Sequence, residues 1–218
     1  MATFALRAAR KGYIAFAFTH ADALVSSYGG KRAYFGTNPV CIAAPRKESE
    51  PFCLDMAPTV LSWNKLLGAR EGGELLDGKN AVDENGNPTD NPELAQSLLP
   101  IGGYKGYGLA VMGEVLCGIL SGMPFGRTIP AMFAAPMDQP RHLGQFYIVM
   151  RTDVCQSQHD FEKRMQMMTD EVRLEPSKNG EKVMLPNDPQ IQETERRKKE
   201  GIPVDNLLIK EFEKLSKE

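Results

Sequence analysis

Residues 98–126 read LLPIGGYKGYGLAVMGEVLCGILSGMPFG, a glycine-rich segment that runs directly into a long apolar one. Gly102, Gly103, Gly106 and Gly108 leave the backbone free to adopt a positive φ and to approach a ligand closely. Lys105 is the only charged residue among these glycines. The combination predicts a loop that receives an anion, although a glycine turn that only joins two packed elements would give the same pattern.

The apolar segment from about 106 to 120 carries a single charged side chain, Glu114. A helix that is apolar on every side is typical of a core, so we predict a buried helix here. A glycine-rich loop that opens into a helix N-terminus offers unpaired N–H groups and the positive end of the helix dipole to a phosphate. The segment as a whole therefore favours an anion site at the start of a buried helix.

Composition limits the class of protein. The chain has 218 residues, 42% of them apolar, and a net charge of −2, so we expect one globular domain over 1–218. A sequence pI near 6.0 gives no broad basic surface, which argues against nucleic-acid binding. Glycines and Glu114 interrupt the longest apolar segment, and no signal-peptide pattern opens the chain, so we expect no membrane span and a cytoplasmic protein. Four scattered cysteines favour reduced core thiols: Cys41, Cys53, Cys117 and Cys155.

Periodicity and breaker residues predict alternating helices and strands. We expect helices over 2–11, 60–70, 157–174, 188–201 and 206–215, and strands over 13–19, 40–44 (ended by Pro45), 52–55 and 146–150. Asp55 ends one of these strands, and a carboxylate at the end of a buried strand lies where open α/β sheets bind ligands. The alternative is that Asp55 or Thr59 caps the helix predicted over 60–70. Both roles for Asp55 stay open.

Several familiar sites are excluded. The chain has no Gly-x-Gly-x-x-Gly after a strand, and no P-loop, because Gly106 follows Lys105 where that motif needs Ser or Thr. It also lacks a Gly-x-Ser-x-Gly elbow and a cluster with metal-ligand spacing. His20 and His142 are conceivable proton carriers, but a lone histidine beside a charge is more often a surface or capping residue.

Three segments together carry a family resemblance: YFGTNP at 34–39, LDMA at 54–57 and LPIGGYKGYG at 99–108. In this order and spacing they resemble the type-2 malate/L-lactate dehydrogenases, NAD(P)-dependent oxidoreductases of 2-hydroxy and 2-oxo acids that lack a Rossmann fold. GMPFGR at 122–127 and HLGQ at 142–145 look most similar to the ureidoglycolate dehydrogenase branch. The resemblance implies a three-layer α/β/α fold with a mixed sheet, of the L-sulfolactate dehydrogenase type, in which 127–218 complete the domain. It also implies a homodimer.

The resemblance further implies a cofactor site for NAD or NADP and a small 2-hydroxy or 2-oxo acid as substrate. Asn187 and Asp188 fall where relatives have Gly-Glu, and Ala21 falls where they have Ser or Asn, so that only its backbone would make contact. The positions that match the family's cofactor contacts are Ala21, Asp55, Met56, Ala57, Lys105, Gly106, Asn187 and Asp188.

The family's catalytic histidine and its substrate-binding arginine have no counterpart in this sequence, where the resemblance places them before Met1. Hydride transfer to a 2-oxo acid needs an acid for the nascent alkoxide and a cation for the carboxylate. We therefore expect an N-terminally truncated, cofactor-binding part of such a dehydrogenase. The alternative is a non-catalytic NAD(H)-binding relative, or a partner subunit that lacks the proton donor.

Overall fold

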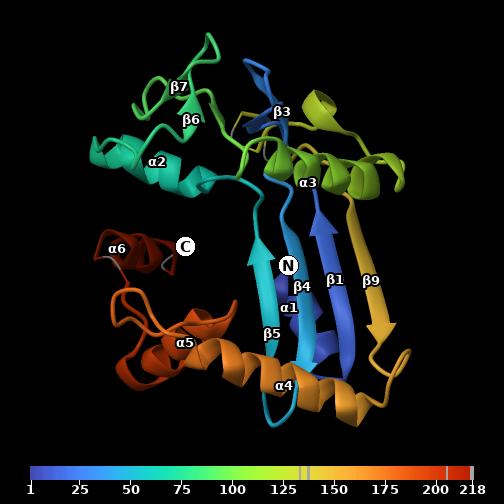
Figure 1. Ribbon diagram of the computed structural model, residues 1–218. Coiled ribbons are helices and arrows are strands. Elements are labelled where there is room, and N and C mark those ends of the chain that lie inside the picture. The colour runs from blue at the N-terminus through green and yellow to red at the C-terminus, as the bar shows by residue number, and fades with distance from the viewer. Residues whose placement is uncertain (133, 137, 205, 217–218) are drawn as a thin grey trace. The chain divides into compact units, whose positions relative to one another are not determined.

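The computed structural model describes residues 1–132, 134–136, 138–204 and 206–216 (Figure 1). The chain divides into two compact units, 1–167 and 168–218, and we describe each by itself. The expectation of a single domain over 1–218 remains a prediction. No helix among the described residues is both long enough and apolar enough to cross a membrane.

The first unit contains two sheets (Figure 1). One has the order β5 (Ser49–Met56), β4 (Val40–Arg46), β1 (Tyr13–Thr19) and β9 (Gln145–Arg151), with every neighbouring pair antiparallel. The other has the order β3 (Ala33–Phe35), β2 (Val25–Ser26), β8 (Ser97–Leu98), β6 (Ala81–Val82) and β7 (Pro88–Thr89). This second sheet is mixed, because β2 and β8 are parallel while its other pairs are antiparallel. The expected α/β fold with a mixed sheet is confirmed.

The helices of the first unit are α1 (Ala2–Ala9), α2 (Trp63–Gly72) and α3 (Tyr104–Glu114), which continues as the π-helical turn η1 (Val115–Ile119). A 3₁₀ turn, η2, follows at Gly126–Thr128. The long helix α4 (Gln158–Leu174) crosses the boundary between the units, and the second unit contains α5 (Asp188–Glu200) and α6 (Asn206–Leu215).

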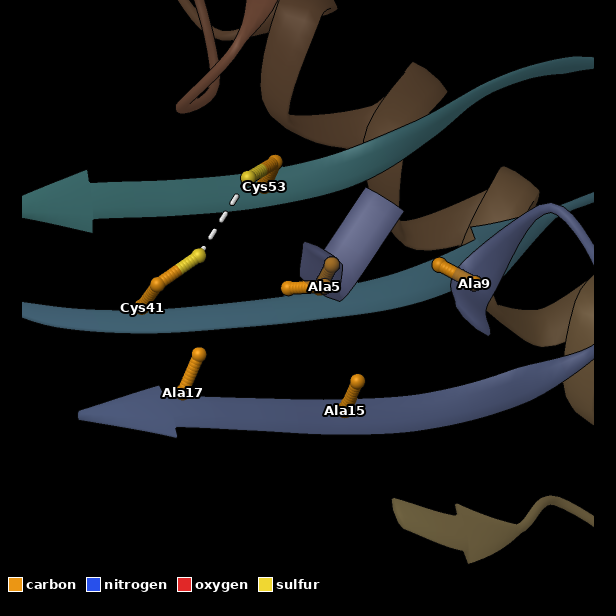
Figure 2. Close-up of a cluster of buried hydrophobic side chains, with 7 residues drawn as sticks. Ala5, Ala9, Ala15, Ala17, Cys41 and Cys53 are labelled. Carbon is orange, nitrogen blue, oxygen red and sulfur yellow. Dashed lines mark hydrogen bonds between the residues drawn. The ribbon is translucent and has the colours of Figure 1, made fainter. Parts of the chain in front are cut away.

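Small side chains build the core between α1 and the four-stranded sheet (Figure 2). Small residues let a helix backbone approach a sheet closely, and the antiparallel register places these residues on one face of the sheet. The cluster consists of Ala5, Ala9, Ala15, Ala17, Cys41, Ala43 and Cys53. A second core under the mixed sheet is built from larger residues, Val25, Leu61, Leu66, Leu76, Ala81, Ala95 and Leu98.

Two predicted boundaries are wrong for local reasons. The strand at 40–44 does not end at Pro45 but continues to Arg46 as β4, because the β4–β5 register shifts between Ala44 and Arg46, and at such an irregularity proline need not donate to the ladder. The helix at 60–70 begins only at Trp63, where Ser62 is the N-cap and its hydroxyl accepts a hydrogen bond from the Lys65 amide at 3.1 Å.

The prediction of a helix buried on every side over 106–120 is also wrong. The buried positions of α3 and η1 are mostly small, Gly106, Ala110, Gly113, Glu114, Cys117 and Gly118. Large apolar residues lie on the exposed side, where Met112, Val115, Ile119 and Leu120 are each more than a third exposed. The helix is therefore packed through its small residues and presents its large apolar ones outward.

Candidate functional site

The glycine loop at the start of α3 carries free hydrogen-bond donors. Gly102 and Gly103 have φ of +59° and +63°, and neither amide has a hydrogen-bond partner among the described residues. Lys105 follows in the first turn of α3, is exposed, and makes no ion pair with any residue that the structure describes. Two unpaired N–H groups, a free ammonium and a helix N-terminus together form an environment that favours an anion.

Backbone hydrogen bonds join this loop to the end of β5. The Ile101 amide donates to the Pro58 carbonyl at 3.0 Å, and Thr59 and Pro100 form an isolated β-bridge. The strand-end residues Asp55, Met56 and Ala57 therefore lead directly into the segment that holds the glycine loop, at the end of the sheet where α3 lies (Figure 1). The structure thus joins the segment that follows these three residues to the segment that leads into Lys105 and Gly106.

Asp55 is exposed at the end of β5, and its carboxylate accepts a hydrogen bond from the Ala2 amide at 2.6 Å. The alternative that Asp55 caps the helix predicted over 60–70 is wrong, because Ser62 caps α2, whereas Asp55 binds the amide of the first residue of α1. Thr59 does not cap α2 either, since its hydroxyl donates to the Leu61 carbonyl at 2.8 Å.

Ala21 lies in a loop held by a buried side chain that the sequence did not single out. The Ala21 amide donates to Asn38 Oδ1 at 3.1 Å, and Asn38 Nδ2 donates to the Ala110 carbonyl of α3 at 2.9 Å and to Glu114 Oε2 at 2.7 Å. Asn38 lies within the segment at 34–39, and Glu114 was visible as the one charge in an apolar helix. Spacing alone gave no indication that these two residues meet.

The two candidate histidines differ in exposure. His20 is 1% exposed, and its Nε2 accepts a hydrogen bond from the Gly144 amide at 2.9 Å. Burial lowers the pKa of His20 below its usual range, against the opposing effect of the Glu114 charge. His142 is exposed with φ of +51°. His20 is therefore a neutral interior residue that solvent does not reach.

Asn187 and Asp188 belong to the second unit. Asn187 is the N-cap of α5 with φ of +80°, and Asp188 is the first residue of that helix. The Asp188 carboxylate is buried and accepts hydrogen bonds from Arg173 Nε at 3.0 Å, from Arg173 Nη2 at 2.8 Å and from the Leu185 amide at 3.0 Å. These bonds anchor the start of α5. The cofactor role expected for the two residues stays a prediction.

The described residues contain no group of His, Cys, Asp and Glu side chains that could hold a metal ion. The groups of the first unit that are suited to bind an anion are the free amides of Gly102 and Gly103 and the Lys105 ammonium, and Asp55 adds a carboxylate at the end of β5.

Comparisons with known proteins identify the family. The profile of the family described as malate/L-lactate dehydrogenase matches residues 1–213. The ureidoglycolate dehydrogenase (NAD(+)) of Escherichia coli K12 is 37% identical over 202 residues, which are 92% of this chain and 58% of that protein. The chain thus spans less than two thirds of the length of this relative.

Solved structures show the same fold. The malate dehydrogenase of Entamoeba histolytica superposes with a TM-score of 0.89 at 23% identity, over 99% of this chain and 63% of that one. The sulfolactate dehydrogenase of Methanocaldococcus jannaschii superposes with a TM-score of 0.84 at 27% identity, over 94% of this chain and 59% of that one. The expected sulfolactate dehydrogenase-like fold is confirmed.

Proposed function

Since the chain belongs to the malate/L-lactate dehydrogenase family, we propose that it binds NAD or NADP as part of an oxidoreductase of small 2-hydroxy and 2-oxo acids. The observation that carries the proposal is Lys105, an exposed lysine in the first turn of α3 that makes no ion pair with a described residue; its loop is joined by the Thr59–Pro100 bridge to the segment that follows Asp55. The relative from Escherichia coli is an NAD(+)-dependent ureidoglycolate dehydrogenase, which makes ureidoglycolate one substrate to test.

The donors of this region fit an anionic dinucleotide. Amides at a helix N-terminus and a lysine ammonium are the groups that bind a pyrophosphate, while a carboxylate such as Asp55 accepts hydrogen bonds from ribose hydroxyls. We assign Lys105 and Gly106 to the phosphates, Asp55, Met56 and Ala57 to the adjoining part of the cofactor, and the Ala21 backbone to a further contact. For Asn187 and Asp188, in the second unit, a role in cofactor binding is proposed from the family resemblance alone.

When bound, the nicotinamide cofactor supplies the hydride acceptor for oxidation of a 2-hydroxy acid, or the donor for reduction of a 2-oxo acid. The reaction also needs a proton carrier at the substrate oxygen. The burial of His20 favours a second candidate function, dinucleotide binding without turnover by these 218 residues alone. Turnover with ureidoglycolate or malate would decide between the two candidates.

We also propose a homodimer in the cytoplasm. The exposed apolar side of α3 and η1, with Met112, Val115, Ile119 and Leu120, is a surface of the kind that subunit interfaces cover. The described cysteines form no disulfide, in keeping with a reducing compartment. Sedimentation equilibrium of the purified chain tests the dimer.

Isothermal titration calorimetry with NADH and with NADPH tests the cofactor site. Losing one charged hydrogen bond costs about 1.5–3 kcal/mol, so Lys105→Ala is expected to weaken binding by about ten- to a hundredfold. Lys65→Ala, an exposed lysine of α2, is the matched control and should leave the affinity unchanged. Folded protein that binds neither dinucleotide, or that binds equally well after Lys105→Ala, would refute the proposal.

A further inference from the structure

A cavity of about 510 Å³ lies in the first unit on the mixed-sheet side of the glycine loop. It is lined by the turn at 29–30, the β6–β7 hairpin and the loop residues Gly102 and Gly103. None of the proposed cofactor residues of the first unit, Ala21, Asp55–Ala57 and Lys105–Gly106, lines it. We propose that this cavity is a second anion site, which takes a small molecule bearing phosphate or carboxylate groups.

The charge of the cavity wall is one-sided. Lys31 and Lys79 both line it, and none of the described lining residues is acidic. Neither lysine forms an ion pair with a residue that the structure describes. The chain as a whole carries a net charge of −2, so two free ammonium groups at one cavity are a local excess of positive charge. A cavity with this charge attracts an anion and repels a cation.

Asp83, one of the two carboxylates in the β6–β7 turn, is hydrogen-bonded within that turn. Asp83 Oδ1 accepts hydrogen bonds from the Asn85 and Asn87 amides, both at 2.9 Å, within the turn of the hairpin. These bonds lower the pKa of Asp83, the one from Asn87 most, so that its charge is held by the turn itself. Asp83 therefore does not neutralise either lysine, and although Glu84 lines a neighbouring hollow together with Lys31, it forms no ion pair with that lysine.

Backbone donors complete the site. The unpaired amides of Gly102 and Gly103 belong to the lining, and they precede α3, an 11-residue helix whose N-terminus carries partial positive charge. Phosphate and carboxylate oxygens accept hydrogen bonds from amides and ammonium groups together, and such charge-assisted bonds are the strong ones. The cavity thus offers two kinds of donor to one anion.

The wall also has a fixed shape. A Cβ on Gly86, where φ is +85°, would lie 2.4 Å from Lys31 Cβ, so the hairpin turn packs directly against the main chain that carries Lys31. The Tyr28 ring lies edge-on to Tyr104 with centroids 6.2 Å apart, and it passes over Gly103, where a Cβ would be 3.4 Å from Tyr28 Cε2. Tyr28 is 62% exposed and gives the anion an apolar wall. A volume of about 510 Å³ matches that of small-molecule sites.

Titration of the ¹⁵N-labelled chain with inorganic phosphate, and separately with citrate, tests the proposal by amide chemical shifts. We expect saturable shifts at Gly29, Gly30, Gly86, Gly102 and Gly103. The double variant Lys31→Gln/Lys79→Gln should weaken this binding at least tenfold, because both ammonium groups are lost. Lys47→Gln, a lysine paired with Glu48 away from the cavity, should leave it unchanged. Absence of saturation in the millimolar range, or equal binding by the double variant, would overturn the anion site.

Two further measurements identify the type of anion and distinguish the proposed anion site from the proposed cofactor site. Saturation by phosphate but not citrate assigns a phosphate ligand, and the reverse assigns a polycarboxylate. NADH affinity measured by calorimetry should be unchanged in the double variant, because neither lysine belongs to the proposed cofactor residues. If the variant loses NADH and phosphate binding together, the cavity is part of the cofactor site and the proposal of a second site is wrong. Loss of phosphate binding alone leaves the proposed function untouched.

Discussion

Asn38 Nδ2 lies 2.7 Å from Glu114 Oε2 in the interior of the first unit, where the two side chains are 0% and 4% exposed as whole residues. Asn38 also donates to the Ala110 carbonyl and accepts from the Ala21 amide, and the other oxygen of Glu114 accepts from the Gly126 amide. The residue adopts φ of +35°, a region that asparagine tolerates better than most side chains. One asparagine therefore fastens α3 to the loop that carries Ala21.

Asn38→Ala should destabilise the chain by about 3 kcal/mol, because it leaves the buried Oε2 of Glu114 and the Ala21 amide without their hydrogen bonds, while Glu114 Oε1 keeps its bond from the Gly126 amide. Urea unfolding followed by circular dichroism measures the loss. Asn64→Ala, at an exposed position of α2, is the matched control and should change stability little. A loss no larger than that of the control would show that the network contributes nothing.

His20 should make stability depend on pH. Burial lowers its pKa in the folded protein, so below the ordinary value of 6.5 the unfolded chain binds a proton that the folded chain does not. The free energy of unfolding should therefore fall as pH drops below about 6.5, by at most about 1.4 kcal/mol per pH unit, until the folded-state pKa is reached.

Urea unfolding of wild type and of His20→Gln between pH 5.5 and pH 7.5, a range of about two units around the ordinary pKa, measures this dependence. Glutamine keeps an acceptor for the Gly144 amide but does not titrate, so the variant should lose the slope. Equal slopes for the two proteins would show that His20 is not the group responsible.

Regular patterns in the sequence predicted most of the fold. Strand β1 begins and ends where alternating aromatic and small residues predicted it, at Tyr13 and Thr19, because period-2 alternation reports a local geometry. The position of the helix predicted over 106–120 was correct, but the prediction that all its sides are buried was wrong. Periodicity in the sequence reports only which side of a helix is hydrophobic. Gly113 is buried because Asn38 packs against it, and only the tertiary fold brings these two residues together.

The candidate site also contains residues that the sequence could predict and residues that only the tertiary structure brings together. Lys105 and the neighbouring glycines could be predicted as a candidate anion loop because they are consecutive in the sequence. Asn38 and Glu114 are separated by 76 positions, and the cavity at Lys31 and Lys79 is assembled from four separate segments. A single sequence does not record contacts between residues so far apart along the chain.

Gly106 and Gly108 offer a matched test on one helix. A Cβ on Gly106 would lie 2.3 Å from the Ile101 carbonyl oxygen and 2.7 Å from its nitrogen, whereas a Cβ on Gly108 would meet nothing within 4 Å. Gly106→Ala should cost about 2–3 kcal/mol, since backbone must move, while Gly108→Ala should stabilise by about 0.5–1 kcal/mol through helix propensity. Thermal unfolding of both variants measures the difference, and equal effects would mean that the loop does not pack as the structure has it.

The cysteines should differ sharply in reactivity. Cys155 is exposed, whereas Cys41, Cys53 and Cys117 are buried, and the sulfurs of Cys41 and Cys53 lie 3.7 Å apart (Figure 2). Burial raises the pKa of Cys117 to about 11, and the hydrogen bond with Cys53 raises that of Cys41, so both stay protonated near neutral pH. The same bond lowers the pKa of Cys53, but its burial blocks access by a reagent.

Native protein treated with an aromatic disulfide reagent at neutral pH should therefore release one equivalent of thiolate rapidly, and the denatured chain four. Cys155→Ser removes the rapid phase if that thiol is the accessible one. Cys117→Ser, at a buried position of η1, should leave the rapid phase in place. A second rapid equivalent that persists in Cys117→Ser would mean that the α1 face of the four-stranded sheet opens on the time scale of the reaction, because only such opening exposes Cys41 or Cys53.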